Sequence, residues 1–79
     1  MWYVYILKCR DTRTYLGCTN DLKKRLFRHQ KGYVFATKNR LPVELIAYFA
    51  VKDKEKAFDF EHYLKTGTGR VFLKKRLFS

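Results

Sequence analysis

Residues 2–19, WYVYILKCRDTRTYLGCT, contain the pattern that decides the fold. Two runs within it, 2–9 and 14–18, are rich in aromatic and β-branched side chains, and the polar segment 10–13 separates them. Such a pattern is typical of two strands joined by a connection longer than a two-residue turn. The sequence therefore predicts a β-hairpin at its N-terminal end.

The predicted hairpin has two different faces, because side chains along a strand alternate from one side to the other. One face is uniformly apolar, which indicates core; it comprises Val4, Ile6, Leu16 and Cys18. The other face carries phenols and a glycine; it comprises Tyr3, Tyr5, Leu7, Tyr15 and Gly17. A glycine among phenols suits a surface that something else approaches closely, or a bulge in the strand. We therefore expect a structural role for Gly17.

The composition predicts one folded domain over residues 1–79, since 47% of the chain is hydrophobic and 18% is aromatic. No apolar run approaches the roughly 20 residues that span a bilayer, and the signals of a secretory leader are missing. We therefore expect a cytoplasmic protein with no membrane partner. A disulfide between Cys9 and Cys18 is conceivable, but reduced thiols are the usual outcome in that compartment. Two cysteines at this spacing do not fit a zinc site.

Positive charge dominates, with 18 lysines and arginines against 7 acidic residues and a net charge of +11. Five of the acids lie between residues 42 and 64, whereas 20–41 holds seven basic residues against one acid. Residues 65–79 hold five basic residues and no acid. A basic surface of this kind suits a polyanion, above all nucleic acid. Solubility alone and an acidic membrane surface are the alternatives.

The segment after the hairpin has the signals of a helix. They are, in order, an N-cap at Thr19 or Asn20, a first-turn acid at Asp21, and Gly32 after a last turn near residue 31. Arg25 and His29 are four residues apart and so share one helical face. Arg25 should lie at the edge of the buried stripe, from where it can point across the sheet.

A third strand and a second helix are expected next. Residues 33–41 have no clean period, which predicts a loop ending at Pro42. Residues 42–51 predict a strand with one side formed by Val43, Leu45, Ala47 and Phe49. Asp53 is a suitable cap for a helix over 54–65, whose core positions are Ala57, Phe60 and Leu64.

Glu61 follows Ala57 by four residues and therefore shares the inward-facing side of that helix. A carboxylate there is paired with a cation, bound to a metal, or placed at the rim of the core. Residues 66–69, TGTG, predict a C-cap and turn. A last short helix is expected over 70–78, with Val71, Phe72 and Leu77 packed and Lys74, Lys75 and Arg76 exposed.

These residues resemble a known family. Tyr3-Val4-Tyr5 and Tyr15-Leu16-Gly17 resemble the paired signatures of GIY-YIG nucleases, with Tyr3 in place of the first glycine. The Arg, His and Glu of that family are matched, in order, by Arg25, His29 and Glu61. The resemblance covers essentially the whole chain and is strongest to the small stand-alone UPF0213-type predicted endonucleases, through residues 4–7 and 65–70. The nuclease domain of the bacterial excision-repair incision subunit is also similar.

The resemblance implies an α+β fold in which helices flank a small three-stranded antiparallel sheet, in the order β-β-α-β-α-α. The periodicity and caps of this chain predict the same order. The resemblance also implies an enzyme that hydrolyses DNA phosphodiester bonds, directed by the structure of its substrate, with a role such as DNA repair at the nucleoid. A protein partner or self-association could supply targeting, and RNA stays open as a substrate.

Site residues follow from the same resemblance. Glu61 would bind one Mg²⁺ or Mn²⁺, and Arg25 would hold the phosphate through a two-pronged hydrogen bond. The general base stays open between Tyr5, Tyr15 and His29. Basic side chains would contact the nucleic-acid backbone; these are Lys23, Lys24, Arg28, Lys38, Arg40, Arg70, Lys74, Lys75 and Arg76.

The chain departs from the family at one place. Many members carry an asparagine in the final helix, and residues 70–79 contain none. Either this asparagine is dispensable in the subgroup, or the nuclease is weak, needs a partner or is inactive. A non-catalytic nucleic-acid-binding module that retains the fold is therefore the alternative function. A protein-interaction domain that uses the aromatic loop 33–41 is a third.

Overall fold

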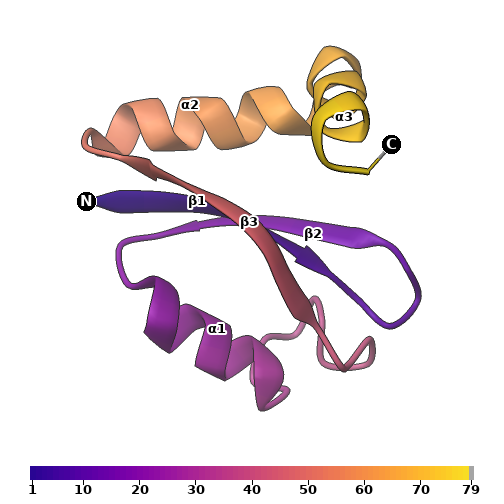
Figure 1. The fold of residues 1–79 in the computed structure, drawn as a ribbon. Helices are drawn as coiled ribbons and strands as arrows, with labels where there is room; N and C mark the ends of the chain where they lie inside the picture. Colours follow the sequence, from indigo (N-terminus) through magenta and orange to yellow (C-terminus); the bar gives the residue numbers. More distant parts are fainter. Residues whose placement is uncertain (79) are drawn as a thin grey trace.

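The computed structural model describes residues 1–78 and has the predicted α+β architecture (Figure 1). Its elements are, in order, β1 (Trp2–Lys8), β2 (Thr14–Thr19), α1 (Leu22–Gln30), β3 (Glu44–Val51), α2 (Lys54–Lys65) and α3 (Gly67–Leu73), which a π-helical turn (Lys74–Phe78) extends. The predicted order β-β-α-β-α-α is therefore confirmed. Within residues 1–78, no helix combines the length and the apolar character needed to cross a membrane.

The three strands form one antiparallel sheet in the order β2-β1-β3, so β2 is an edge strand. The hairpin register is unbroken and places Tyr5 opposite Gly17. Gly17 therefore does not lie in a bulge, which was one of its two expected roles. Instead it belongs to the regular ladder of the edge strand.

The sheet contains an irregularity in β3 that the sequence did not indicate. The pairing of β1 with β3 shifts between Ile6, opposite Ala47, and Leu7, opposite Leu45, so that Ile46 is the extra residue. A bulge of this kind moves the following side chains to the other face. The predicted common side for Val43, Leu45, Ala47 and Phe49 is therefore wrong, and the strand begins at Glu44 rather than at residue 42.

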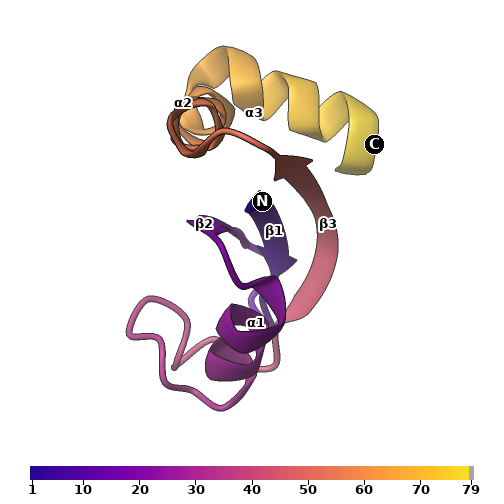
Figure 2. The same ribbon diagram turned by 90° about the vertical axis from the view of Figure 1, so that its left-hand side faces the viewer.

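Helices cover both faces of the sheet (Figures 1 and 2), and each face has its own hydrophobic cluster. On one face α2 and α3 bury the predicted core side chains Val4, Ile6, Ala57 and Leu64, together with Leu73. On the other face α1 packs its Leu22 and Leu26 against Tyr5, Leu7, Cys9 and Val43. The composition of the face with the phenols suggested an open surface, but α1 covers this face. The two cysteines are free thiols that lie in different clusters.

The helix ends differ in part from expectation. Asp53 caps α2 by accepting from the backbone N–H of Lys56 at 3.1 Å, as predicted. Asp21 is itself the cap of α1, because its carboxylate accepts from the backbone N–H of Lys24 at 3.0 Å. Thr19 instead accepts from the N–H of Asp21. Gly32 follows α1 with a φ of 79°, in the left-handed region that glycine adopts without strain.

The last helix begins at Gly67, three residues before the predicted start, since Thr66 caps it by accepting from the N–H of Gly69. Gly69 is buried against the backbone of Tyr63 and Leu64, so closely that an added Cβ would clash with it. Leu73 is the residue that packs, whereas the side chains predicted to do so are exposed: Val71, Phe72 and Leu77.

Candidate active site

The candidate site lies at the edge of the sheet, where the side chain of Tyr5 reaches across β2. Tyr5 and Gly17 are directly opposite in the ladder, and an added Cβ at Gly17 would collide with the phenol of Tyr5. Any other residue at position 17 would therefore displace the ring. The glycine of the second motif is required here by close approach, which is the other of its two expected roles.

A chain of buried hydrogen bonds joins β1, α1 and the loop after α1. The hydroxyl of Tyr5 is 2.9 Å from Nε2 of His29, and Nδ1 of His29 is 2.9 Å from the hydroxyl of Thr37. All three side chains are at most 1% exposed. A neutral imidazole donates from one nitrogen and accepts at the other, and both neighbours can do either, so two proton arrangements satisfy the chain. The imidazole is thus fixed from both sides.

The surroundings favour the neutral forms of Tyr5 and His29. Burial, and to a smaller extent the nearby Tyr15, raise the pKa of Tyr5 to about 12, although the guanidinium of Arg25 acts in the opposite direction. Burial lowers the pKa of His29 below its ordinary 6.5, and the positive charge of Arg25 lowers it further. At neutral pH the pair is therefore an uncharged phenol bonded to an uncharged imidazole.

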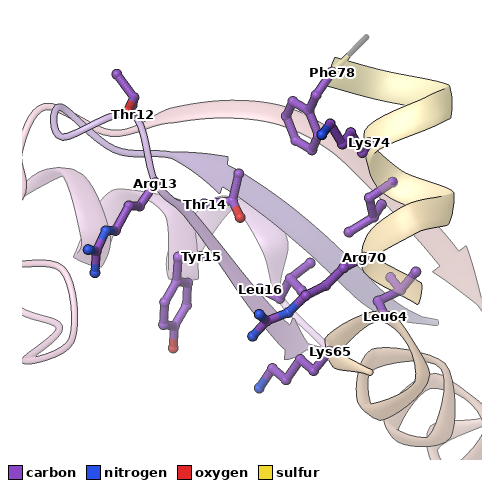
Figure 3. Close-up of a pocket in the computed structure, with 11 residues that line it drawn as sticks. Thr12, Arg13, Thr14, Tyr15, Leu16, Leu64, Lys65, Arg70, Lys74 and Phe78 are labelled. Carbon is purple, nitrogen blue, oxygen red and sulfur yellow. The ribbon is translucent and has the colours of Figure 1, made fainter. Parts of the chain in front are cut away.

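Tyr15 differs from Tyr5 because it is only half-buried. Its ring centroid lies 5.0 Å from that of His29 and 6.3 Å from that of Tyr5. Tyr15 is also among the residues that line an open groove of about 720 Å³ between β2 and the C-terminal helices (Figure 3). Of the three candidate bases, Tyr15 is therefore the one in contact with solvent and with a space that a substrate could enter.

Arg25 and Glu61 reach the same region from opposite faces of the sheet. The charges of both act on the pKa of Tyr5 and on that of Cys18, a side chain of the edge strand, whose pKa is raised chiefly by burial. Arg25 comes from α1 on one face and Glu61 from α2 on the other. The sheet separates the two helices, so the side chains of Arg25 and Glu61 can approach each other only around its edge strand β2.

Glu61 is buried, with its side chain 12% exposed, and its Oε2 lies 3.4 Å from Nζ of Lys65 one turn later. Of the three environments expected for this carboxylate, the rim is excluded and the ion pair is present. Among residues 1–78, no group of three His, Cys, Asp or Glu side chains could hold a metal. The donor set is a single carboxylate, which fits Mg²⁺ or Mn²⁺ that keeps most of its waters and does not fit zinc.

The nine basic residues expected to bind nucleic acid do not form one surface. Lys23, Lys24 and Arg28 are exposed on α1, while the exposed Arg70, Lys74, Lys75 and Arg76 belong to the layer on the other side of the sheet (Figure 2). Lys38 lies over the ring of Phe35, and Arg40 is bound to Asp11, its Nε 2.9 Å from the carboxylate. Only Arg70 and Lys74 of this set line the groove beside Tyr15.

Three residues near the candidate site had not been selected from the sequence. Thr37 lies in a loop without periodicity, so nothing in the local pattern marked it as buried. Arg13 belongs to the hairpin connection, and Lys65 is the last residue of α2; both line the groove with Tyr15. The charge of 65–79 was visible in the sequence, but its position beside β2 depends on how α3 crosses α2.

Comparison with known proteins gives one consistent family. Residues 1–76 match the GIY-YIG catalytic domain. A UPF0213 protein of Clostridium perfringens is 42% identical over 66 residues, which are 82% of this chain and 71% of the relative. The UPF0213 protein YazA of Bacillus subtilis is 40% identical over 77 residues, covering 96% and 75%. The solution NMR structure of the UPF0213 protein BH0048 from Bacillus halodurans is 34% identical and superposes with a TM-score of 0.59, covering 95% of this chain and 84% of that one.

Proposed function

Because this chain belongs to the GIY-YIG family, within its UPF0213 group, we propose that it is a divalent-metal-dependent endonuclease that hydrolyses DNA phosphodiester bonds. The observation that supports this most is the buried Tyr5–His29 pair with Tyr15 packed against His29, close enough to Arg25 and Glu61 for both charges to act on the pKa of Tyr5. We infer that residues 1–79 act as one domain with this site at its centre.

Arg25 has the role of binding the scissile phosphate. A guanidinium donates two parallel hydrogen bonds to phosphate oxygens and stays charged at any physiological pH. As charge builds on those oxygens during attack, a fixed cation stabilises the transition state more than the ground state. Arg25 also opposes the charging of His29, which keeps the imidazole neutral beside it.

Tyr15 is the phenol placed to orient or deprotonate the attacking water. It is the half-exposed member of the tyrosine pair, whereas Tyr5 is 1% exposed and its pKa of about 12 disfavours the phenolate. Tyr5, His29 and Thr37 then act as a buried support that fixes the rings beside Tyr15. In this assignment Tyr5 and His29 are positioning residues.

Glu61 would hold the metal ion. When bound, one Mg²⁺ or Mn²⁺ supplies positive charge to the phosphate and to the leaving oxygen. Lys65 neutralises Glu61 when no metal is present, so metal binding has to compete with a partly screened ion pair.

A cleavage assay tests the proposal. The wild type and Glu61→Gln are incubated with supercoiled plasmid and with branched and single-stranded DNA, in Mg²⁺, in Mn²⁺ and in EDTA. We expect metal-dependent cleavage by the wild type and a loss of at least about a hundredfold in the variant, with DNA binding retained. Glu55→Gln is the matched control, since Glu55 is an exposed carboxylate on the same helix.

Two outcomes would contradict different parts of the proposal. Equal cleavage by the wild type and Glu61→Gln would show that Glu61 is not the metal ligand or that another nuclease is present. No cleavage of any substrate, with salt-sensitive DNA binding by the wild type, would favour a binding module that retains the fold.

A further inference from the structure

The groove beside the candidate site has the chemistry of a strand-binding channel. Its rim carries four exposed cationic side chains, from the hairpin connection and the two C-terminal helices: Arg13, Lys65, Arg70 and Lys74. Among the lining residues that the structure describes, none is acidic. Figure 3 shows Lys65 and Arg70 extending toward β2 from the helical side, with Tyr15 nearby. The rim therefore offers several cationic side chains to an anion.

The floor of the groove is apolar. Leu16 of β2 and Leu73 of α3 contribute to it, and Phe78 closes one end with a ring that is 40% exposed. A DNA duplex presents phosphates, sugars and base edges at its surface, while the flat faces of its bases are stacked inside. An apolar floor with an exposed ring below a cationic rim suits unpaired bases, whose faces are free to stack.

Two residues connect this groove to the candidate site. Tyr15 lines the groove and contacts His29 in the site. Lys65 lines the groove, and its ammonium group lies 3.4 Å from the carboxylate of Glu61. The groove and the candidate site are therefore adjacent and share Tyr15 and the Glu61–Lys65 pair.

We propose that this groove binds an unpaired DNA strand that flanks the bond to be cleaved. The proposal rests on the proposed nuclease function and narrows its substrate to DNA with a single-stranded segment beside the scissile phosphate. The phosphates lie along Arg70 and Lys74, and a base stacks on Phe78. The groove reads backbone and unpaired bases without selecting a sequence.

Equilibrium binding in EDTA tests the groove independently of cleavage. The probes are a labelled single-stranded DNA of about 12 nucleotides, the blunt duplex and the RNA of the same sequence, followed by fluorescence anisotropy over a salt range. We expect the single-stranded DNA to bind about tenfold more tightly than the duplex. Phe78→Ala should lower the affinity for the single strand about tenfold and leave the affinity for the duplex unchanged, while Phe78→Tyr should retain both.

The salt dependence of binding tests the charged rim separately. The double variant Arg70→Ala/Lys74→Ala should reduce the slope of log K against log salt for the single strand by about 1.4, because two phosphate contacts are lost. Lys56→Ala is the matched control, since Lys56 is an exposed cation in the first turn of α2, at the other end of the helix from Lys65. Circular dichroism and thermal melting of each variant show that the fold is intact.

Equal binding of duplex and single strand, tighter binding of RNA, or an unchanged affinity in Phe78→Ala would overturn the groove proposal. These outcomes are separate from the fate of the nuclease proposal. Glu61-dependent cleavage of fully paired DNA without single-strand preference would contradict the groove proposal and support the nuclease proposal. Single-strand binding that depends on Phe78, without cleavage of any substrate, would support the groove proposal and contradict the nuclease proposal.

Discussion

The two faces of the sheet differ in what fills the space between sheet and helix. Apart from the buried carboxylate of Glu61, the filling on the α2 face is aliphatic and aromatic, and α2 makes close backbone approaches to all three strands. On the α1 face the helix makes fewer close approaches, and the space holds the bonded side chains of Tyr5, His29 and Thr37 beside leucines. The same strands serve both faces because their side chains alternate.

This difference separates stability from chemistry in a very small protein. Close apolar packing on the α2 face removes the most nonpolar surface from water, so it should dominate the free energy of unfolding. The α1 face contains titratable groups in fixed geometry, which is what a reaction needs and what stability alone does not require. The candidate site lies where the two faces meet, at the edge strand β2.

The largest effect on stability is expected on the α2 face. Ile6→Ala should lower the free energy of unfolding by about 2–5 kcal/mol, because Ile6 is fully buried in the cluster under α2. Urea or thermal denaturation measures it. Val71→Ala is the control, and a change below about 0.5 kcal/mol is expected because Val71 is 54% exposed. Similar losses in both variants would contradict the observed orientation of α3.

A smaller loss of stability is expected at the point where Tyr5 crosses β2. Gly17→Ala should cost about 1–3 kcal/mol and should also reduce cleavage, because the new Cβ displaces the phenol of Tyr5. Gly67→Ala is the matched control: nothing lies near its added Cβ, and alanine in a helix should be neutral or stabilising by up to about 1 kcal/mol. If Gly17→Ala were as stable and active as the wild type, close approach would not be the reason for this glycine.

The smallest effect is the pH dependence that distinguishes the α1 face. The pKa of His29 is lowered by burial, so the unfolded chain binds a proton more readily than the folded one. The resulting stability is present above about pH 6.5 and should fall by at most about 1.4 kcal/mol per pH unit as the pH drops below it. His29→Gln should remove this slope, measured by denaturation from pH 7.5 to about 5.

His62 supplies the control for that measurement. It is the second of the two histidines and is exposed on α2. His62→Gln should keep the acid-side slope of the wild type, since the exposed ring meets solvent in both the folded and the unfolded chain. A slope that disappears in His62→Gln and persists in His29→Gln would contradict the account, because the pH-sensitive group would then be on α2 and not on α1.

Local signals in the sequence were sufficient for most of the fold. Alternation in the hairpin assigned Val4 and Ile6 to one face and Tyr5 and Leu7 to the other, as observed. Helical spacing identified Ala57 and Leu64 as core, and Asp53 as a cap. These features depend on residues close together in the chain, so a periodic pattern contains them.

The features that were wrong or missed depend on contacts between distant segments. The bulge at Ile46 is a property of the pairing between β1 and β3, and neither strand alone shows it. The position of α3 depends on Gly69 against the backbone at Tyr63 and Leu64. Thr37 is buried only because the loop folds back onto His29. The candidate site residues were placed in order by family resemblance, and their roles stay predictions.

The most direct test of chemistry at the edge of β2 is the single-turnover rate of DNA cleavage by Tyr15→Phe, compared with Tyr5→Phe at saturating Mg²⁺. We predict a loss of at least about a hundredfold for Tyr15→Phe with unchanged stability, because the half-exposed phenol acts on the attacking water. Tyr5→Phe should lose less activity and more stability, since it leaves the buried Nε2 of His29 without its partner. Full activity in Tyr15→Phe, with cleavage abolished in a folded Tyr5→Phe, would contradict the assignment.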